Sequence, residues 1–355
     1  MSVYKVFSTL DGRITVPYSE VTHVCMTPSI HALLQYLLLF DYDTVTNHTC
    51  YITGYAVSDE MASRLPGIWS SIKQTGVRPS LCRLLEKFMT RFTASHKYPF
   101  LRTAELYAFD VGFVPPYIGS RPYALLSDGP MGLSQNMQVN SAEYLRQRKR
   151  KHSLQGRLVE FMIGPVAVLG WGNNAQCKAF YLTEPNNAVV LRNKEVYVNS
   201  LQSLWDKASQ PLKDFVRYVF DVSDEDVNTI NSKRFVFLTQ PMVKDGILSE
   251  DEYLQILKNI FSHYDQSQLL LKLHPRDDFD YKRYFPKVIV YGKKVNMQLL
   301  VILGANVERA ATICSSSINS FPESVEADWY GVDIHPKIKA WFGNVAPPNR
   351  SYKQM

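Results

Sequence analysis

The chain has 355 residues, more than one hydrophobic core usually organises, and this length suits two domains of about 150 to 180 residues each. Hydrophobic residues make up 46% and charged residues 20%, a composition that excludes a largely disordered chain. The net charge of +6 is modestly basic, so the position of the cations along the chain matters more than their total.

The N-terminal part alternates between strand and helix patterns. A β-rich run, Val21 to Met26, precedes Thr27 and Pro28, which predict a capped helix over the apolar stretch Ile30 to Phe40. A strand at Cys50 to Ile52, a helix within residues 68–95 and a strand within residues 104–114 follow. This order predicts a parallel α/β domain.

The patterns weaken between about residue 132 and residue 230. A helix-like stretch, 201–222, ends this part, and we place the domain boundary between residues 228 and 229. The predicted domains are therefore residues 1–228 and residues 229–355.

A run of cations stands within this middle part, at Arg146, Arg148, Lys149, Arg150, Lys151 and Arg157. Such a run forms a solvated face, or it binds an anionic membrane surface or nucleic acid through counterion release. It lacks the interleaved aromatic residues of a base-stacking surface, so we expect no nucleic-acid partner. A solvated face and contact with an anionic membrane surface or an anionic acceptor both stay open.

The C-terminal part shows a clearer alternation. The predicted strands are residues 235–239, 269–273, 287–291 and 311–314. Ser249 and Glu252 form a capping-box pattern for a helix that runs to about His263, and a helix is predicted over residues 297–303. These elements predict a second doubly wound lobe. Two such lobes facing across a cleft would bind a ligand at the carboxyl ends of their strands.

The sequence also bears on the cellular compartment. The five cysteines are odd in number and widely spread, which indicates reduced thiols and no disulfide framework. The first residues lack the basic and apolar regions of a signal peptide, and no run of roughly 18 apolar residues occurs. We therefore expect a cytoplasmic protein.

Two predicted strand ends carry polar residues. His274-Pro275-Arg276 follows the apolar run LLLKL, and Ser315-Ser316-Ser317 follows ATIC. Both loops would open on the same edge of a doubly wound sheet, where an imidazole, hydroxyls and backbone N–H groups could converge on one anion. A phosphate fits that description. Taken singly, each motif is also compatible with an ordinary surface loop.

Residues 234–321 resemble glycosyltransferase family 52, which contains bacterial lipooligosaccharide sialyltransferases. The segments RFVFLTQPMVKDGILS, LLLKLHPRD and ATICSSSINSF carry the resemblance, and CMTPSIHALL extends it. The resemblance implies a GT-B fold and inverting transfer of sialic acid from CMP-sialic acid to a terminal sugar, galactose, of a surface glycan. It also implies no metal or other cofactor, a homodimer, and a place at the inner face of the membrane.

The resemblance assigns roles at the donor site. His274, with Pro275, would contact the CMP phosphate and stabilise or protonate it as it leaves. Ser315, Ser316 and Ser317 would hold the phosphate oxygens, and Arg276 or Lys272 would assist the donor carboxylate. Gln298 stands where related enzymes place a glutamate that holds the base or the ribose, so the nucleotide contact would differ here.

The general base has two candidates. Related sialyltransferases carry an acidic-acidic-glycine motif, and Asp128 in Ser127-Asp128-Gly129 is the nearest match, with serine in place of the first acid. Asp245, before Gly246, follows the first strand of the nucleotide-binding lobe. Asp-Gly is also an ordinary turn signal. Asp128 is slightly preferred.

Other interpretations stay open. Asp41-Tyr42-Asp43 matches the DxD pattern of metal-dependent transferases, but it follows a predicted helix, so we expect no metal there. A polysialic acid or capsule glycosyltransferase fits the same motifs. A non-catalytic nucleotide-binding assembly protein is the alternative from another class.

Overall fold

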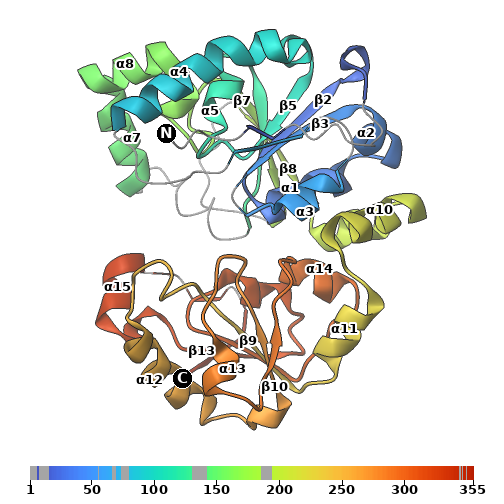
Figure 1. Cartoon of the computed structure of the whole chain (residues 1–355), viewed down its shortest axis with the longest axis vertical. Coiled ribbons are helices and arrows are strands. Elements are labelled where there is room, and N and C mark those ends of the chain that lie inside the picture. Colours follow the sequence, from blue (N-terminus) through green and yellow to red (C-terminus); the bar gives the residue numbers. More distant parts are fainter. Residues whose placement is uncertain are drawn as a thin grey trace. The chain divides into compact units, whose positions relative to one another are not determined.

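The structure, a computed structural model, divides into two compact units, Met1–Val219 and Phe220–Met355. Figure 1 shows that each unit is a sheet flanked by helices. The residues described are 6–7, 16–54, 56–65, 69–72, 80–129, 142–184, 194–343, 345, 347–348 and 350–355.

The first unit is built on an eight-stranded sheet with the order β1-β4-β3-β2-β5-β6-β7-β8. All paired strands are parallel except β1, which is antiparallel to β4. The strands are β1 (Val6–Phe7), β2 (His23–Thr27), β3 (Thr49–Gly54), β4 (Trp69–Ile72), β5 (Glu105–Ala108), β6 (Tyr123–Leu126), β7 (Cys177–Leu182) and β8 (Glu195–Val198). The helices are α1 (Ile30–Leu39), α2 (Tyr42–Asn47), α3 (Asp59–Ser63), α4 (Ser80–Lys97), α5 (Pro115–Ile118), α7 (Ala142–His152), α8 (Leu154–Ile163), α9 (Leu201–Lys207) and α10 (Gln210–Phe220).

The centre of this sheet is buried on both faces. Every residue of β3 is buried, and so are the last four of β2, which explains their continuous apolar sequence. Helix α1 is buried from Ile30 to Leu38 and therefore shows no polar stripe. Its first turn is capped by Ser29, which accepts a hydrogen bond from the backbone N of Ala32 at 3.3 Å.

The second unit has a six-stranded, wholly parallel sheet with the order β11-β10-β9-β12-β13-β14. Counted from β9, this is the strand order of a dinucleotide-binding fold, in which the chain reverses direction across the sheet between β9 and β12. The strands are β9 (Phe235–Leu238), β10 (Leu269–Lys272), β11 (Ile289–Tyr291), β12 (Arg309–Thr312), β13 (Glu326–Trp329) and β14 (Lys353–Gln354). The helices are α11 (Asp224–Asn231), α12 (Glu250–Phe261), α13 (Tyr281–Tyr284), α14 (Met297–Ile302) and α15 (Pro336–Phe342).

The predicted α/β class with two doubly wound units is confirmed. Strands β2 to β8 repeat the same order, with the reversal between β2 and β5. The capping box of Ser249 and Glu252 also forms as predicted at the start of α12.

The structure divides between Val219 and Phe220, at the last residue of α10, whereas the predicted boundary at residues 228 and 229 falls within α11. Helix α11 belongs to the second unit because Asp226 accepts hydrogen bonds from the Tyr291 hydroxyl at 3.1 Å and from Lys293 Nζ at 2.9 Å.

Three local predictions differ from the structure. Thr27 ends β2 and does not cap α1, because Ser29 takes that position. Residues 69–72 form β4, so the helix predicted within 68–95 is the later α4. The helix predicted over 201–222 is divided into α9 and α10, and the new helix starts beside Pro211, which lacks an N–H.

Among the described residues, Cys25, Cys50, Cys177 and Cys314 are buried and take part in no disulfide. Burial raises the pKa of Cys314 to about 12, so it is a thiol at neutral pH. None of the helices in the described ranges combines the length and the apolar character needed to cross a bilayer.

Gly172 provides a test of packing in the first unit. Its φ is +70°, and a Cβ there would lie 2.4 Å from Phe180 Cζ. Gly246 also has a φ of +70°, but a Cβ there would meet no atom within 4 Å. Both alanine variants carry the strain of a positive φ, so Gly172→Ala should lower the free energy of unfolding by about 1 to 3 kcal/mol more than Gly246→Ala. Urea unfolding of the two variants measures this difference. Equal losses of unfolding free energy would contradict the close packing of Phe180 against Gly172.

Candidate functional site

The carboxyl edge of the second sheet brings the two predicted motifs together. His274 follows β10 and Ser315 follows β12, and these two strands flank β9. All three strands are parallel, so the loops after them open on one edge. The serine loop lies at the reversal point between β9 and β12, where doubly wound folds bind ligands.

The end of β9 holds both motifs in place. Thr239 Oγ1 accepts a hydrogen bond from the backbone N of His274 at 3.0 Å and donates to Asp277 at 2.5 Å. On the other side, Cys314 Sγ donates to Gln240 Oε1 at 2.9 Å. Thr239 and Gln240 match no motif in the sequence, and the signal that marks them is a polar pair directly after a buried strand.

The His274 ring is held in one orientation. Its Nδ1 accepts a hydrogen bond from the backbone N of Arg276 at 3.1 Å, which places the proton of the neutral ring on Nε2. Partial burial lowers the pKa of His274 to about 4, with smaller contributions from the cations Arg276 and Lys272. At neutral pH the ring is therefore an uncharged N–H donor.

The serine loop is fixed through its backbone. The N–H of Ser315 donates to Thr312 Oγ1 at 3.1 Å, and Ser315 Oγ accepts from the backbone N of Ser317 at 3.4 Å. Residues Ser316–Ser320 form a 3-10 turn, and all three serines of the motif are partly exposed. The hydroxyl of Ser315 stabilises the turn, whereas Ser316 and Ser317 extend the same edge.

Gln298 lies close to this turn. It stands in the first turn of α14, which packs against the 3-10 turn 316–320. Its backbone N donates to Asn296 Oδ1 at 2.7 Å, and its side chain is partly exposed. An amide at this position can both donate and accept hydrogen bonds.

Arg276 and Asp245 form an ion pair beside His274. Arg276 Nη1 lies 2.6 Å from Asp245 Oδ1, and the Asp245 side chain is 20% exposed. Lys272 is buried, and its ammonium donates to the backbone oxygens of Leu273 and Lys293. Burial lowers the pKa of Lys272 to about 7. Arg276 therefore presents its charge at the surface, while Lys272 lies beneath it.

Asp128 belongs to the first unit and follows β6. The residue as a whole is exposed, but surrounding protein partly desolvates its carboxyl group, and this desolvation raises the pKa of Asp128 to about 6. A hydrogen bond with the Ser29 side chain acts in the opposite direction. Ser127 is buried, and its backbone N donates to Gln35 Oε1 at 2.8 Å. Ser127 therefore stabilises the end of β6 from a buried position, and Asp128 is the residue exposed at the surface.

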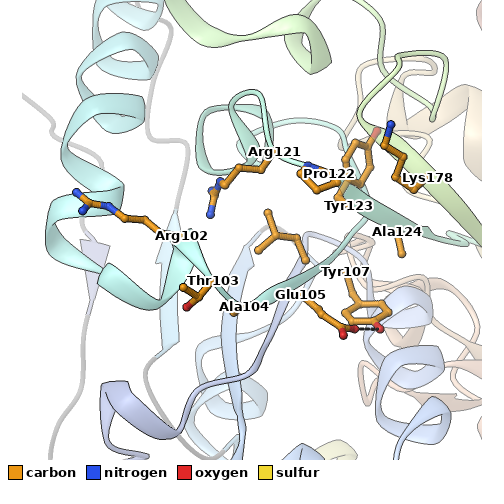
Figure 2. A pocket seen from close by; sticks show the side chains of 11 residues that line it. Arg102, Thr103, Ala104, Glu105, Tyr107, Arg121, Pro122, Tyr123, Ala124 and Lys178 are labelled. Atoms are coloured by element: carbon orange, nitrogen blue, oxygen red, sulfur yellow. Dashed lines mark hydrogen bonds between the residues drawn. The ribbon is translucent and has the colours of Figure 1, made fainter.

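A cavity of about 320 Å³ lies elsewhere on the first unit (Figure 2). Its lining includes Glu105 and Tyr123, the first residues of β5 and β6, together with Arg121 and Lys178. It therefore opens at the amino ends of these strands. The carboxyl edge that carries Asp128 is at their other ends.

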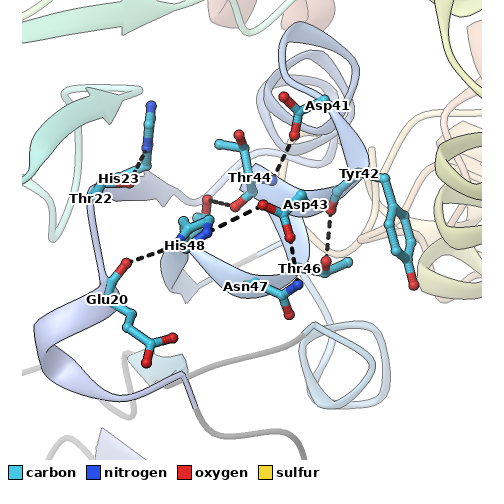
Figure 3. A network of polar contacts seen from close by, with 11 residues as sticks. Glu20, Thr22, His23, Asp41, Tyr42, Asp43, Thr44, Thr46, Asn47 and His48 are labelled. Carbon is cyan, nitrogen blue, oxygen red and sulfur yellow. Dashed lines mark hydrogen bonds and ion pairs between the residues drawn. The ribbon is translucent and has the colours of Figure 1, made fainter.

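The DxD pattern caps a helix (Figure 3). Asp41 Oδ1 accepts from the backbone N of Thr44 at 2.8 Å, at the N-terminus of α2. Asp43 accepts from Asn47 Nδ2 at 2.7 Å and lies 3.3 Å from His48 Nε2. Over the ranges that the structure describes, no three His, Cys, Asp or Glu side chains gather as metal ligands would.

Comparison with known proteins gives a family match. The family model of glycosyltransferase family 52 matches residues 118–338, which include Asp128, His274 and the three serines. An uncharacterized protein of Haemophilus influenzae is 31% identical over 207 residues, which cover 58% of this chain. The match spans 65% of the length of that relative.

Solved structures share the fold. An α/β-galactoside α-2,3-sialyltransferase of Photobacterium phosphoreum has 12% identity and a TM-score of 0.51, with 94% of this chain and 98% of that chain covered. A 2,6-sialyltransferase of a Photobacterium species, solved with CMP and lactose, has 13% identity and a TM-score of 0.54, with 86% and 71% covered. At these identities the likeness concerns the fold alone.

The protonation of His274 can be measured directly. In the ligand-free protein the ring should stay neutral until the pH falls to about 4, because partial burial disfavours the cation. His48 serves as an internal reference, since its hydrogen bond to the backbone oxygen of Glu20 raises the pKa of that ring. Histidine side-chain NMR, with His274→Gln to assign the signal, follows both rings. A His274 signal that titrates at the ordinary pKa of about 6.5 would contradict the described environment.

Proposed function

The chain belongs to glycosyltransferase family 52, and from this premise we propose that it is an inverting, metal-independent sialyltransferase. It moves sialic acid from CMP-sialic acid to a terminal sugar, galactose, of a surface glycan such as lipooligosaccharide. The observation that carries this proposal is the edge around β9, where a neutral imidazole donor and a serine turn lie on either side of one strand end.

The donor chemistry fits this edge. Transfer breaks the bond between the anomeric carbon and a phosphate oxygen of CMP, and negative charge grows on that oxygen. The Nε2–H of His274 donates to the oxygen, and Ser316 and Ser317 donate from the other side of β9. An arriving phosphate raises the pKa of the ring, because an adjacent anion favours imidazolium. His274 can then pass its proton to the departing CMP. Ser315 maintains the turn, Pro275 shapes the histidine loop, and Gln298 holds the nucleoside.

The acceptor step needs a base. The acceptor hydroxyl attacks the anomeric carbon, and its proton passes to a carboxylate. Asp128 is the better candidate because a pKa raised to about 6 makes it a stronger base while it stays ionised at neutral pH. The Asp245 carboxylate forms an ion pair with Arg276 at 2.6 Å. Its proposed role is therefore to position the Arg276 guanidinium beside the donor.

The cellular setting follows from the substrates. The Photobacterium 2,6-sialyltransferase was solved with CMP and lactose, and we carry the same donor product and acceptor class over to this chain as part of the proposal. A glycolipid acceptor is held at a membrane, so we place the protein in the cytoplasm, in peripheral contact with the inner face of the membrane. The homodimer that the family resemblance implies is also part of the proposal.

The first test is CMP release from CMP-sialic acid with and without lactose, in EDTA. We expect acceptor-stimulated release that survives EDTA and falls by about 100- to 1,000-fold in His274→Ala, because one donor to the leaving oxygen is lost. CMP binding by calorimetry serves as the control for folding. CMP binding without release over a wide range of acceptors would favour a non-catalytic nucleotide-binding protein, and release only with sialylated acceptors would favour chain extension.

The second test assigns the base. Asp128→Asn should lower the rate by about 100- to 10,000-fold while CMP affinity stays unchanged, and Asp245→Asn should chiefly weaken donor binding. The wild-type rate should fall as the pH drops through about 6, since protonated Asp128 cannot accept a proton. This acidic limb should be absent from the residual rate of Asp128→Asn. If Asp245→Asn alone abolished turnover with CMP affinity intact, the assignment would be reversed.

A further inference from the structure

The cavity at the amino ends of β5 and β6 (Figure 2) is built by segments that enter three neighbouring strands. Residues 102–104 lead into β5, Arg121 and Pro122 lead into β6, and Lys178 stands near the start of β7. Strand β6 pairs in parallel with both β5 and β7, so the three amino ends lie side by side. The cavity therefore rests on the sheet of the first unit, and its volume of about 320 Å³ suits a small ligand.

Positive charge dominates the described lining of this cavity. Arg102, Arg121 and Lys178 are its cations, and Glu105 is its one carboxylate. Glu105 accepts a hydrogen bond from the Tyr107 hydroxyl at 2.7 Å, which Figure 2 shows at the lower edge of the cavity. Three cations against one carboxylate leave an excess of two positive charges on the wall.

The charge of Arg121 is not neutralised by any carboxylate in the part of the chain that the structure describes. Its Nε donates to the backbone oxygen of Ile118 at 3.1 Å, whereas its Nη1 is buried and has no acceptor among the described residues. Partial burial lowers the pKa of the guanidinium to about 10, so the group keeps its charge at neutral pH. A bound ion is one of the recognised explanations for a buried cationic N–H that lacks an acceptor.

The chemistry of the wall defines the class of anion. A guanidinium matches the oxygens of a phosphate in a bidentate geometry, and a phosphate monoester carries a charge of about −1.5 to −2 at neutral pH. The excess of two positive charges suits such a dianion better than a single carboxylate. Leu106, Pro122 and Ala124 add apolar surface to the lining, which suits a small organic body such as a sugar ring.

We propose that this cavity binds a phosphate monoester carried on a body about the size of one sugar ring. Arg121 is its main contact, and the exposed cations Arg102 and Lys178 attract the anion from solvent. The cavity lies at the amino ends of the strands, whereas Asp128 follows the carboxyl end of β6, so it is separate from the proposed base. The inference rests on the cavity alone and does not depend on the proposed sialyl transfer.

The test is isothermal titration calorimetry of the full chain with glucose 6-phosphate, inorganic phosphate and glucose. We expect glucose 6-phosphate to bind, inorganic phosphate to bind more weakly and glucose to give no heat. Arg121→Gln should weaken the binding of glucose 6-phosphate by about 10- to 100-fold, because a charge-assisted contact is lost. The matched control Arg283→Gln removes an exposed arginine from the second unit and should leave the affinity unchanged.

Two more variants separate the cavity from other effects. Ala124→Phe keeps every cation but fills the cavity, so it should weaken the binding of glucose 6-phosphate by about tenfold or more. His274→Gln alters the donor edge of the second unit, where a phosphate could also bind, and should leave this affinity unchanged. Urea unfolding of each variant checks that the fold is retained.

Each outcome bears on the proposal. Equal affinity in the wild type and Arg121→Gln would overturn it, as would the absence of binding by either phosphate. Loss of binding in His274→Gln with none in Arg121→Gln would place the phosphate at the donor edge and would also overturn it. Inorganic phosphate that binds as tightly as glucose 6-phosphate would refute the sugar-sized body. CMP release with lactose is measured separately, so a failure of the proposed transfer leaves the calorimetric result intact.

Discussion

The parallel pairing of β9 with both β10 and β12 is the constraint on which the candidate site depends. Because β9 lies between β10 and β12, residues at the end of β9 can contact both the His274 loop and the serine loop. Thr239 does so on one side by accepting from the backbone of His274, and Gln240 does so on the other by accepting from Cys314. His274 is thus positioned through its main chain and through its Nδ1, which accepts a hydrogen bond from the backbone N of Arg276. The Nε2–H is the ring group that can donate to a ligand.

An anion bound at this edge would stabilise the cationic forms of the nearby side chains. Burial disfavours the cationic forms of both His274 and Lys272, whose pKa values fall to about 4 and about 7. A bound phosphate would favour the protonated form of each side chain and so increase the positive charge beside it. Asp245 holds the exposed guanidinium of Arg276 nearby. Binding and proton transfer at this edge are therefore linked.

Much of this arrangement follows from local sequence, and the rest depends on contacts between distant residues. Buried parallel strands give continuous apolar runs, so Leu269 to Leu273 and its following loop were predictable. The partner of Thr239 is 35 residues away, and that of Asp245 is 31 residues away. The placement of α11 depends on Asp226 and Lys293, which are 67 residues apart. No periodicity or turn signal specifies such pairs, because each is set by the order of strands in the sheet.

Helix α4, on the surface of the first unit, shows the same limit of prediction from local sequence. Its apolar residues were sufficient to predict a helix, but they lie on more than one face, so the pattern alone does not tell an inward face from an outward one. The structure separates them, since Leu84 packs against the buried residues of α8 whereas Leu85 and Met89 face outward. One apolar face of α4 is covered by α8, whereas the neighbouring face with Leu85 and Met89 is exposed. The tertiary neighbours of the helix, and not its apolar periodicity, therefore decide which face is buried.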